Sequence, residues 1–456
     1  MTHPDLTCLA QRLSRSAPSR RIGRVNHVER GLVQVSGIND VAALGDRLEV
    51  RAPSMDAIAG EVISLGADTL TMLPERSLSG VVRGMQVHHY KPLQIAPHAS
   101  WIGRVIDPNA KPLDGRPLMP GSKACEIHAP PPAPATRGAF GRRLETGLAA
   151  FNTFLPIVEG QRIGLFSGSG VGKSSLLGQL AKGLESDICV IALIGERGRE
   201  LRDFVTGVLG PEGMQRAIVV AATSDTSPLL RRQCAWTAAA VAEFFRDQGH
   251  HVLFLADSLT RFAEAHREIA LSAGEPASLR GYPPSTAHML MALCERLGPG
   301  NYDSGHITAV LSVLVAGSDM EEPIADIVRG VLDGHVVLDR KIAERGRFPA
   351  IDLLRSVSRS LPDAATEHEN ELLSRGRALA GAYASAEMMV QAGLYAPGAD
   401  PLIDAAVASH QALDLLMSRR GSIEESFDKL SAAVVEESAV VAPKLPTESE
   451  APKLSE

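Results

Sequence analysis

The chain has 456 residues, of which 45% are hydrophobic and 22% are charged, and its formal net charge is −7. This is enough apolar material for two or three packed domains, and no apolar run reaches the roughly 20 residues that span a bilayer. The arginines near the N-terminus accompany no continuous hydrophobic stretch, so we expect no signal peptide and a cytoplasmic location. The negative charge and the aromatic content of 4% argue against nucleic acid as a partner.

Residues 1–21 are predicted to form an N-terminal extension. Leu6, Leu9 and Leu13 recur at helical spacing with arginines nearby, which is typical of a short amphipathic helix. Such a helix docks on a partner in some proteins and is a loose terminal segment in others. The residues support both interpretations equally.

Residues 22–92 show short β-type runs separated by turn residues. Examples are the runs 31–35, 47–51 and 80–84. Alternating strands at this spacing predict a small β-barrel domain. In residues 93–365, β-type runs alternate with helical stretches, which predicts an α/β domain built on a parallel sheet.

Residues 366–435 are predicted to form a C-terminal helical domain, because the β-type runs stop there. The segments 367–392 and 404–417 have helical character and are separated by glycine and proline residues. Residues 436–456 contain the sequence Ala-Pro-Lys-Leu twice among Ser, Thr and Glu. This composition predicts a disordered tail.

A glycine-rich turn follows the apolar run 163–166 and ends in Lys173 and Ser174. In a phosphate-binding loop the backbone N–H groups surround the phosphate oxygens, the lysine neutralises the outer phosphates and the serine hydroxyl ligates Mg²⁺. Ser167 stands where the pattern has glycine, but the remaining glycines keep the turn feasible. The chain is therefore predicted to bind a nucleoside triphosphate. The residues predicted to form this site are Gly168, Ser169, Gly170, Val171, Gly172, Lys173, Ser174 and Ser175.

Two carboxylates follow apolar runs that are predicted to be buried strands. Asp257 follows the run 252–256, and at the carboxyl end of a strand it would hold Mg²⁺, through water, or simply cap the strand. Glu196 follows the run 189–194 together with Arg197. A carboxylate there can polarise an attacking water, although Glu196 could equally be a surface ion-pair partner.

Hydrolysis also needs a positive charge for the transition state. Arg359 ends the segment 356–359, which follows a turn at 348–349, and is a candidate for this role, but it is one arginine among many. Phe348 precedes a proline turn and could stack on an adenine or pack in the core. The residues alone favour core packing for Phe348.

These motifs, in this order, resemble those of the hexameric ATPase family that includes the catalytic subunits of rotary ATP synthases and the type III protein-export ATPases. The resemblance extends from about residue 22 to residue 430. The loop with a non-glycine first position, Ser167, and the sequence Arg-Gly-Tyr-Pro-Pro-Ser at 280–285 are similar to the export branch. The flagellar export ATPases are the most similar group, with the virulence secretion ATPases as the alternative. The other stretches that carry the resemblance are 103–107, 112–115, 160–166, 195–200 and 323–326.

The resemblance implies roles for single residues. Glu196 matches the catalytic glutamate of the family, and Arg359 matches the arginine that reaches into the nucleotide site of a neighbouring subunit. Phe348 lies where the family usually has an adenine-stacking tyrosine. Export ATPases commonly carry acidic residues where this chain has Ala316 and Ser318, and this departure affects any polar contact made there; Asp319 and Asp326 are kept.

The resemblance also implies a RecA-like P-loop core and a homo-hexameric ring that hydrolyses Mg²⁺-ATP and energises or primes type III export of flagellar subunits. The barrel would assist assembly, and the C-terminal helices would face the export gate. The implied partners are a regulatory stator protein, a central stalk protein, the export gate and chaperone–substrate complexes. The implied location is the inner face of the cytoplasmic membrane, with peripheral association.

Two other classes of function share such a core. A non-catalytic ring subunit of the rotary type has little need of a water-orienting carboxylate, so Glu196 argues against it. A ring-shaped RNA translocase needs basic and aromatic residues along its channel, and no basic stripe with interleaved aromatics precedes the core. Catalysis is the preferred interpretation.

Overall fold

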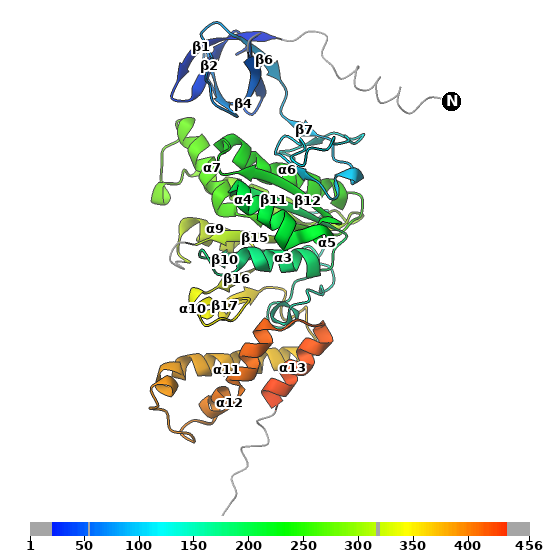
Figure 1. Ribbon diagram of the computed structural model, residues 1–456, viewed down its shortest axis with the longest axis vertical. Coiled ribbons are helices and arrows are strands. Elements are labelled where there is room, and N and C mark those ends of the chain that lie inside the picture. Colours follow the sequence, from blue (N-terminus) through cyan, green and yellow to red (C-terminus); the bar gives the residue numbers. More distant parts are fainter. Residues whose placement is uncertain (1–20, 53–54, 316–319, 436–456) are drawn as a thin grey trace, which may run out of the picture.

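The computed structural model describes residues 21–52, 55–315 and 320–435. Along its longest axis the chain is divided into a barrel at one end, a helix-covered sheet in the middle and a group of helices at the other end (Figure 1). The expected N-terminal helix and the expected tail 436–456 lie outside the described residues, as do Ala316, Ser318 and Asp319. No helix of the described ranges is long and apolar enough to cross a bilayer.

The N-terminal strands close into a barrel in the order β1-β2-β5-β4-β3-β6. Alternate residues of each strand fill its interior, as in β2, where Val33 and Val35 are fully buried. The strand expected at 80–84 is wrong: Gly80 and Gly84 have φ of 84° and 90°, which an extended strand does not allow, and the segment is a turn. The strands are β1 (Ile22–Glu29), β2 (Leu32–Ser36), β3 (Arg47–Ala52), β4 (Met55–Leu65), β5 (Leu70–Pro74) and β6 (Gln86–Tyr90).

The central sheet has the strand order β17-β16-β10-β15-β13-β11-β12-β8. Its strands are parallel except for β17, which pairs antiparallel with β16, and for the short β14 beside β15. The strands are β8 (Val105–Ile106), β10 (Arg162–Ser167), β11 (Ile188–Glu196), β12 (Ala217–Thr223), β13 (Val252–Asp257), β14 (Gly298–Pro299), β15 (His306–Leu314), β16 (Gly334–Leu338) and β17 (Ile351–Ser358). A separate pair is formed by β7 (Gln94–Ile95) and β9 (Cys125–Glu126).

Both faces of this sheet are covered, which explains its almost continuous apolar strands. Val190 and Ile194 of β11 pack with α6, α7, α8 and α9 on one face, whereas Ile191 and Leu193 pack with α3 on the other. The helices are α2 (Ala149–Asn152), α3 (Lys173–Gly183), α4 (Gly198–Asp203), α5 (Gly210–Met214), α6 (Pro228–Arg246), α7 (Leu259–Ser272), α8 (Ser285–Arg296), α9 (Pro323–Val331) and α10 (Arg340–Glu344). Two 3₁₀ turns, η1 (Ala99–Trp101) and η3 (Leu279–Gly281), and a π-helical turn, η2 (Phe204–Leu209), complete this part.

Three helices form the C-terminal end: α11 (Glu367–Gln391), α12 (Pro401–Ser418) and α13 (Ile423–Val435). Thr366 and Glu369 form a capping box at the start of α11, which satisfies two backbone N–H groups that a helix start leaves unpaired. Leu373 and Leu430 from these helices join the core cluster on the α3 side of the sheet.

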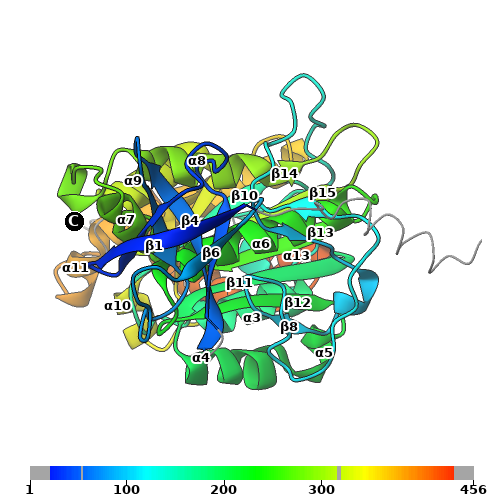
Figure 2. The same ribbon diagram turned by 90° about the horizontal axis from the view of Figure 1, so that it is seen from above.

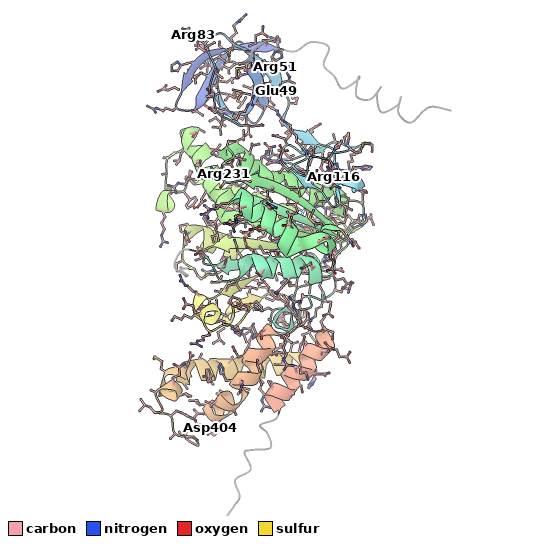
Figure 3. All side chains as sticks on the ribbon, in the orientation of Figure 1. Glu49, Arg51, Arg83, Arg116, Arg231 and Asp404 are labelled. Atoms are coloured by element: carbon pink, nitrogen blue, oxygen red, sulfur yellow. The ribbon has the colours of Figure 1, made fainter. Side chains whose placement is uncertain are left out.

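The barrel also contacts the central part directly. Seen down the long axis, its strands lie in front of the sheet (Figure 2). Arg232 of α6 donates to Glu61 of β4 at 2.7 Å, and Leu73 of β5 packs on Leu229 and Ile269. Figure 3 shows Arg231 on the central part, with Asp404 at the far helical end.

Candidate active site

The phosphate-binding loop connects β10 to α3, which begins at Lys173. Gly170 and Gly172 have φ of 78° and 83°, a left-handed conformation that favours glycine. Ser167 is the last residue of β10 and has extended backbone, so the backbone at this position does not require glycine. The departure from the glycine pattern is therefore compatible with the turn.

The loop forms one wall of a cavity of about 640 Å³. The first residues of α3 point their N–H groups toward this space, and the positive end of the helix dipole favours an anion there. Val171 instead points into the core, with an exposure of 2%. The lining residues are Gly168, Ser169, Gly170, Gly172, Lys173, Ser174, Ser175, Gly195, Glu196, Arg197, Glu200, Ser224, Arg231, Arg261 and Leu314.

Lys173 and Asp257 form an ion pair at the inner end of the loop. The Lys173 Nζ donates to Oδ1 of Asp257, which also accepts a 2.8 Å hydrogen bond from the hydroxyl of Ser312. The Lys173 and Asp257 side chains are only 12% and 6% exposed. Lys173 follows β10 and Asp257 ends β13, with β15 between the two strands. The structure brings the two side chains together because the carboxyl ends of parallel strands lie at the same edge of the sheet.

Glu196 ends β11 on the opposite wall of the cavity. Burial, the hydrogen bond with Glu200 and the negative charge of Asp257 together raise the pKa of its carboxyl group to about 7, against the opposing charge of Lys173. A carboxylate with a pKa near neutrality can accept a proton from a water molecule. Arg197, the next residue, also lines the cavity, but its side chain is 80% exposed and only 3.7 Å from Glu200.

A smaller cavity of about 190 Å³ lies beside the first. Ser174, Glu196 and Asp257 all line it, and hydroxyl and carboxylate oxygens are the ligands that Mg²⁺ prefers. Within the described ranges no group of three or more His, Cys, Asp or Glu could hold a metal ion. The hydroxyl of Ser174 and the carboxylate of Asp257 nevertheless fit Mg²⁺, because this ion usually takes one or two protein ligands together with substrate phosphates.

Phe348 lies in the loop between α10 and β17, directly beside the phosphate-binding loop. A Cβ atom placed on Gly172 would be 3.1 Å from the Phe348 ring, so the ring and the loop backbone are in close approach. The side chain is 51% exposed. Core packing, the interpretation favoured by the residues alone, does not describe this half-exposed position.

Arg359 is the one predicted site residue that lies apart from the others. It follows β17, its side chain is exposed, and its guanidinium donates to the carbonyl of Arg329 at 3.5 Å. It does not line either cavity described above. Within a single chain, Arg359 and the loop therefore do not form one site.

The structure adds residues to which the sequence analysis assigned no role. Glu200, Arg231 and Arg261 line the main cavity, and Ser312 contacts Asp257. A signal existed for two of them: Arg261 follows four residues after Asp257, and Ser312 is a polar residue inside an apolar strand. Arg231 lies at the start of α6, and the sequence gives no indication that this helix end faces the loop.

A covered parallel sheet with a phosphate-binding loop after β10 and a carboxylate at the end of β13, two strands away, defines a P-loop nucleotide-hydrolysing protein. Residues 147–358 match the model of the ATP synthase alpha/beta family, nucleotide-binding domain. Residues 365–432 match the T3SS EscN ATPase C-terminal domain.

Relatives of known name match almost the entire chain. The "Flagellum-specific ATP synthase" of Caulobacter vibrioides is 42% identical, with 92% of this chain and 97% of the relative covered. The "Type 3 secretion system ATPase" of Xanthomonas euvesicatoria is 39% identical, with 93% and 95% covered. The solved structure of the assembled ATPase EscN with its central stalk EscO, from enteropathogenic E. coli, is 34% identical with a TM-score of 0.82, covering 90% of this chain and all of that chain. The chain belongs to the family of flagellum-specific and type III secretion ATPases, and it is an ATP-hydrolysing enzyme.

Proposed function

We propose that this chain is the ATPase of a flagellar type III export apparatus and that it works as a homo-hexameric ring. The observation that carries the proposal is the convergence of Lys173, Glu196 and Asp257 beside the phosphate-binding loop: Glu196 lines both adjoining cavities, Lys173 lines the larger and Asp257 the smaller, and Lys173 and Asp257 form an ion pair. A binding-only ring subunit has no use for a buried carboxylate whose pKa lies near 7. Hydrolysis of Mg²⁺-ATP would energise or prime the export of flagellar subunit proteins.

The loop and its lysine bind the nucleotide in this proposal. The loop N–H groups and Lys173 hold the phosphates, and the Phe348 ring stacks on the adenine. Ser174 and Asp257 would hold Mg²⁺, which supplies positive charge to the phosphate oxygens when it is bound. Lys173 leaves part of its contact with Asp257 when it engages the phosphates.

Glu196 acts on the attacking water. Its ionised carboxylate orients the water and accepts a proton from it, and Arg197 adds a positive charge at the rim of the same cavity. Arg359 of a neighbouring subunit then stabilises the charge that develops on the transferred phosphoryl group, an effect worth about 10³-fold or more for such arginines. Two observations support this role in trans: Arg359 is exposed, and it lines neither cavity of its own chain.

The partners follow from the relatives. The assembled EscN structure contains a central stalk, and we propose an equivalent stalk protein for this chain, held in the centre of the ring. A regulatory stator protein, the export gate and chaperone–substrate complexes complete the proposed set. The ring would associate peripherally with the inner face of the cytoplasmic membrane.

A virulence secretion apparatus is the second candidate. The match of residues 365–432 to the EscN C-terminal domain favours it, and so does the similarity to the Xanthomonas protein. Deleting the gene and restoring it on a plasmid distinguishes the flagellar candidate from the virulence candidate. Loss and recovery of swimming and of flagellin secretion support the flagellar assignment, whereas normal motility contradicts it.

The catalytic proposal is tested by phosphate release per subunit at increasing protein concentration, with saturating Mg²⁺-ATP and no nucleic acid. We expect the specific activity to rise steeply with concentration, because each site needs a residue from a neighbour. A flat line near zero contradicts the proposal and favours a non-catalytic ring subunit that needs a different partner. Stimulation by RNA favours a translocase instead.

A further inference from the structure

Ser312 is a polar side chain inside a strand that is otherwise apolar at its centre. Strand β15 runs from His306 to Leu314, and Leu311 and Val313 on either side of Ser312 are both 0% exposed, as Ser312 itself is. A buried hydroxyl without a hydrogen-bond partner destabilises a protein. The partner of the Ser312 hydroxyl is the carboxylate of Asp257, at 2.8 Å.

The sheet register explains why these two side chains meet. Strands β13 and β15 are parallel neighbours, and Ala256 lies opposite Leu311. Asp257 and Ser312 are each one residue further along, so their side chains project on the same face. This is the face of Leu255 and Val310, which pack with helix α3 behind the phosphate-binding loop.

Asp257 has two side-chain donors in this structure, and they differ in how firmly they are placed. Lys173 lies at the start of α3 and reaches Asp257 through a flexible four-carbon chain. Ser312 holds its hydroxyl on a short side chain in a central strand that is hydrogen-bonded to β10 and β13. When Lys173 turns to the phosphates, the Ser312 bond is the contact that stays in place.

We propose that Ser312 is a positioning residue that holds the carboxylate of Asp257 in its metal-binding orientation while Lys173 is engaged with the nucleotide. The proposal rests on the function proposed above for Asp257. It assigns to Ser312 no contact with nucleotide or metal. Its effect is on the gain in nucleotide affinity that Mg²⁺ provides.

The test measures the dissociation constant of a fluorescent ADP analogue with Mg²⁺ and with EDTA, for the whole chain and its variants. The Mg²⁺ ratio is the dissociation constant in EDTA divided by the dissociation constant with Mg²⁺. In Ser312→Ala we expect this ratio to fall about tenfold, since a hydrogen bond to a charged group is worth roughly this factor. Affinity in EDTA stays unchanged, because Lys173 and the loop are intact. Ser312→Thr keeps the hydroxyl and restores the ratio.

The matched control is Thr308→Val, which removes another fully buried hydroxyl from the same strand. Thr308 bonds to the backbone N–H of Gly160 and to His251 at the other end of β15. We expect this variant to lower the melting temperature and to leave the Mg²⁺ ratio as in the unchanged chain. If Ser312→Ala does not fold, Ser312→Cys fills the same space with a weaker donor, and we expect its ratio to lie below that of Ser312→Thr.

Asp257→Asn tests the metal role of Asp257 separately from the positioning role of Ser312. If Asp257→Asn lowers the Mg²⁺ ratio and Ser312→Ala leaves it unchanged, the positioning role of Ser312 is overturned and the metal role of Asp257 stands. If Asp257→Asn has no effect on the ratio, the proposed metal site itself is wrong. An equal fall of the ratio in Thr308→Val and Ser312→Ala overturns the positioning role as well, because the effect is then one of general packing.

Discussion

The two sides of the proposed site differ in how deeply their side chains are buried and how many contacts fix them. On the loop side, Lys173, Glu196 and Asp257 are buried or half-buried and make contacts with one another or with fixed neighbours. On the arginine side, Arg359 is exposed and makes a 3.5 Å contact with the carbonyl of Arg329. The residues proposed to bind nucleotide are therefore already positioned within one chain. The arginine proposed to stabilise the transition state would be fixed in place only by contact with a neighbouring subunit.

The largest effect is expected on the arginine side. Arg359→Ala should lower turnover by about 10³-fold or more while nucleotide binding stays within a few-fold, because the arginine acts on developing charge. Mixing it with Lys173→Ala, which is also inactive, should restore activity in steady-state phosphate release. In a mixed ring, some sites combine the intact loop of one variant with the intact arginine of the other.

The control for this experiment is Arg375→Ala, which removes an exposed arginine of α11 that lines neither cavity. It should keep full activity. The contrary outcome is a mixture that forms rings of normal size by light scattering and still shows no recovery of activity. That result would mean that Arg359 does not act on a neighbour's nucleotide, and it would contradict the division of the site between two subunits.

Glu196→Gln is expected to have the next largest effect. The amide cannot accept a proton from water, so turnover should fall about 10²- to 10⁴-fold. ATP should still bind with nearly unchanged affinity, because Lys173 and the loop are untouched. Single-turnover phosphate release and equilibrium binding of labelled ATP measure the two quantities separately, and normal phosphate release would overturn the assignment of Glu196.

Phe348→Ala is expected to weaken ATP binding by about tenfold, since base–aromatic stacking is worth about 1–3 kcal/mol. The ring is 51% exposed, so its loss should change the melting temperature little. Phe348→Tyr keeps the ring and should keep the affinity. A large fall in stability without a change in ATP affinity would show that the ring serves packing instead.

The smallest effect concerns pH. The Glu196 carboxyl, with its pKa raised to about 7, must be ionised to act as a base. Activity should fall about twofold between pH 8 and pH 7 and then about tenfold per unit below. Glu200→Gln removes a group that raises the pKa of Glu196, so the acidic limb of the rate profile should move to lower pH. An unshifted limb would mean that another group controls it.

Local patterns allowed much of this structure to be predicted from the sequence. The apolar runs before Ser167 and Glu196, and the run that ends in Asp257, are strands β10, β11 and β13 of the sheet. The loop between strand and helix is where its glycines indicate. The valines at 81 and 82 favour extended backbone and predict a strand at 80–84, but the positive φ of the glycines at its two ends makes this segment a turn.

The remaining features of the site depend on contacts between distant segments. Phe348 approaches Gly172 although 175 residues separate them in the chain, and no local pattern encodes that approach. The pKa of Glu196 depends on burial and on Glu200 and Asp257, which a residue type alone does not reveal. The Ser312 hydroxyl meets Asp257 only through the register of two parallel strands.

The class of chemistry follows from the amino-acid sequence alone, because a phosphate-binding loop needs glycines, a lysine and a hydroxyl at fixed spacing along one short segment. The order of barrel, sheet and helices follows from the sequence as well, since hydrophobic period and turn residues are local properties. Three properties depend on the folded chain: which side chains face the loop, how far Glu196 is desolvated, and the position of Arg359 outside both cavities. These properties arise from the packing of segments that are far apart in the chain, and packing depends on all of them at once.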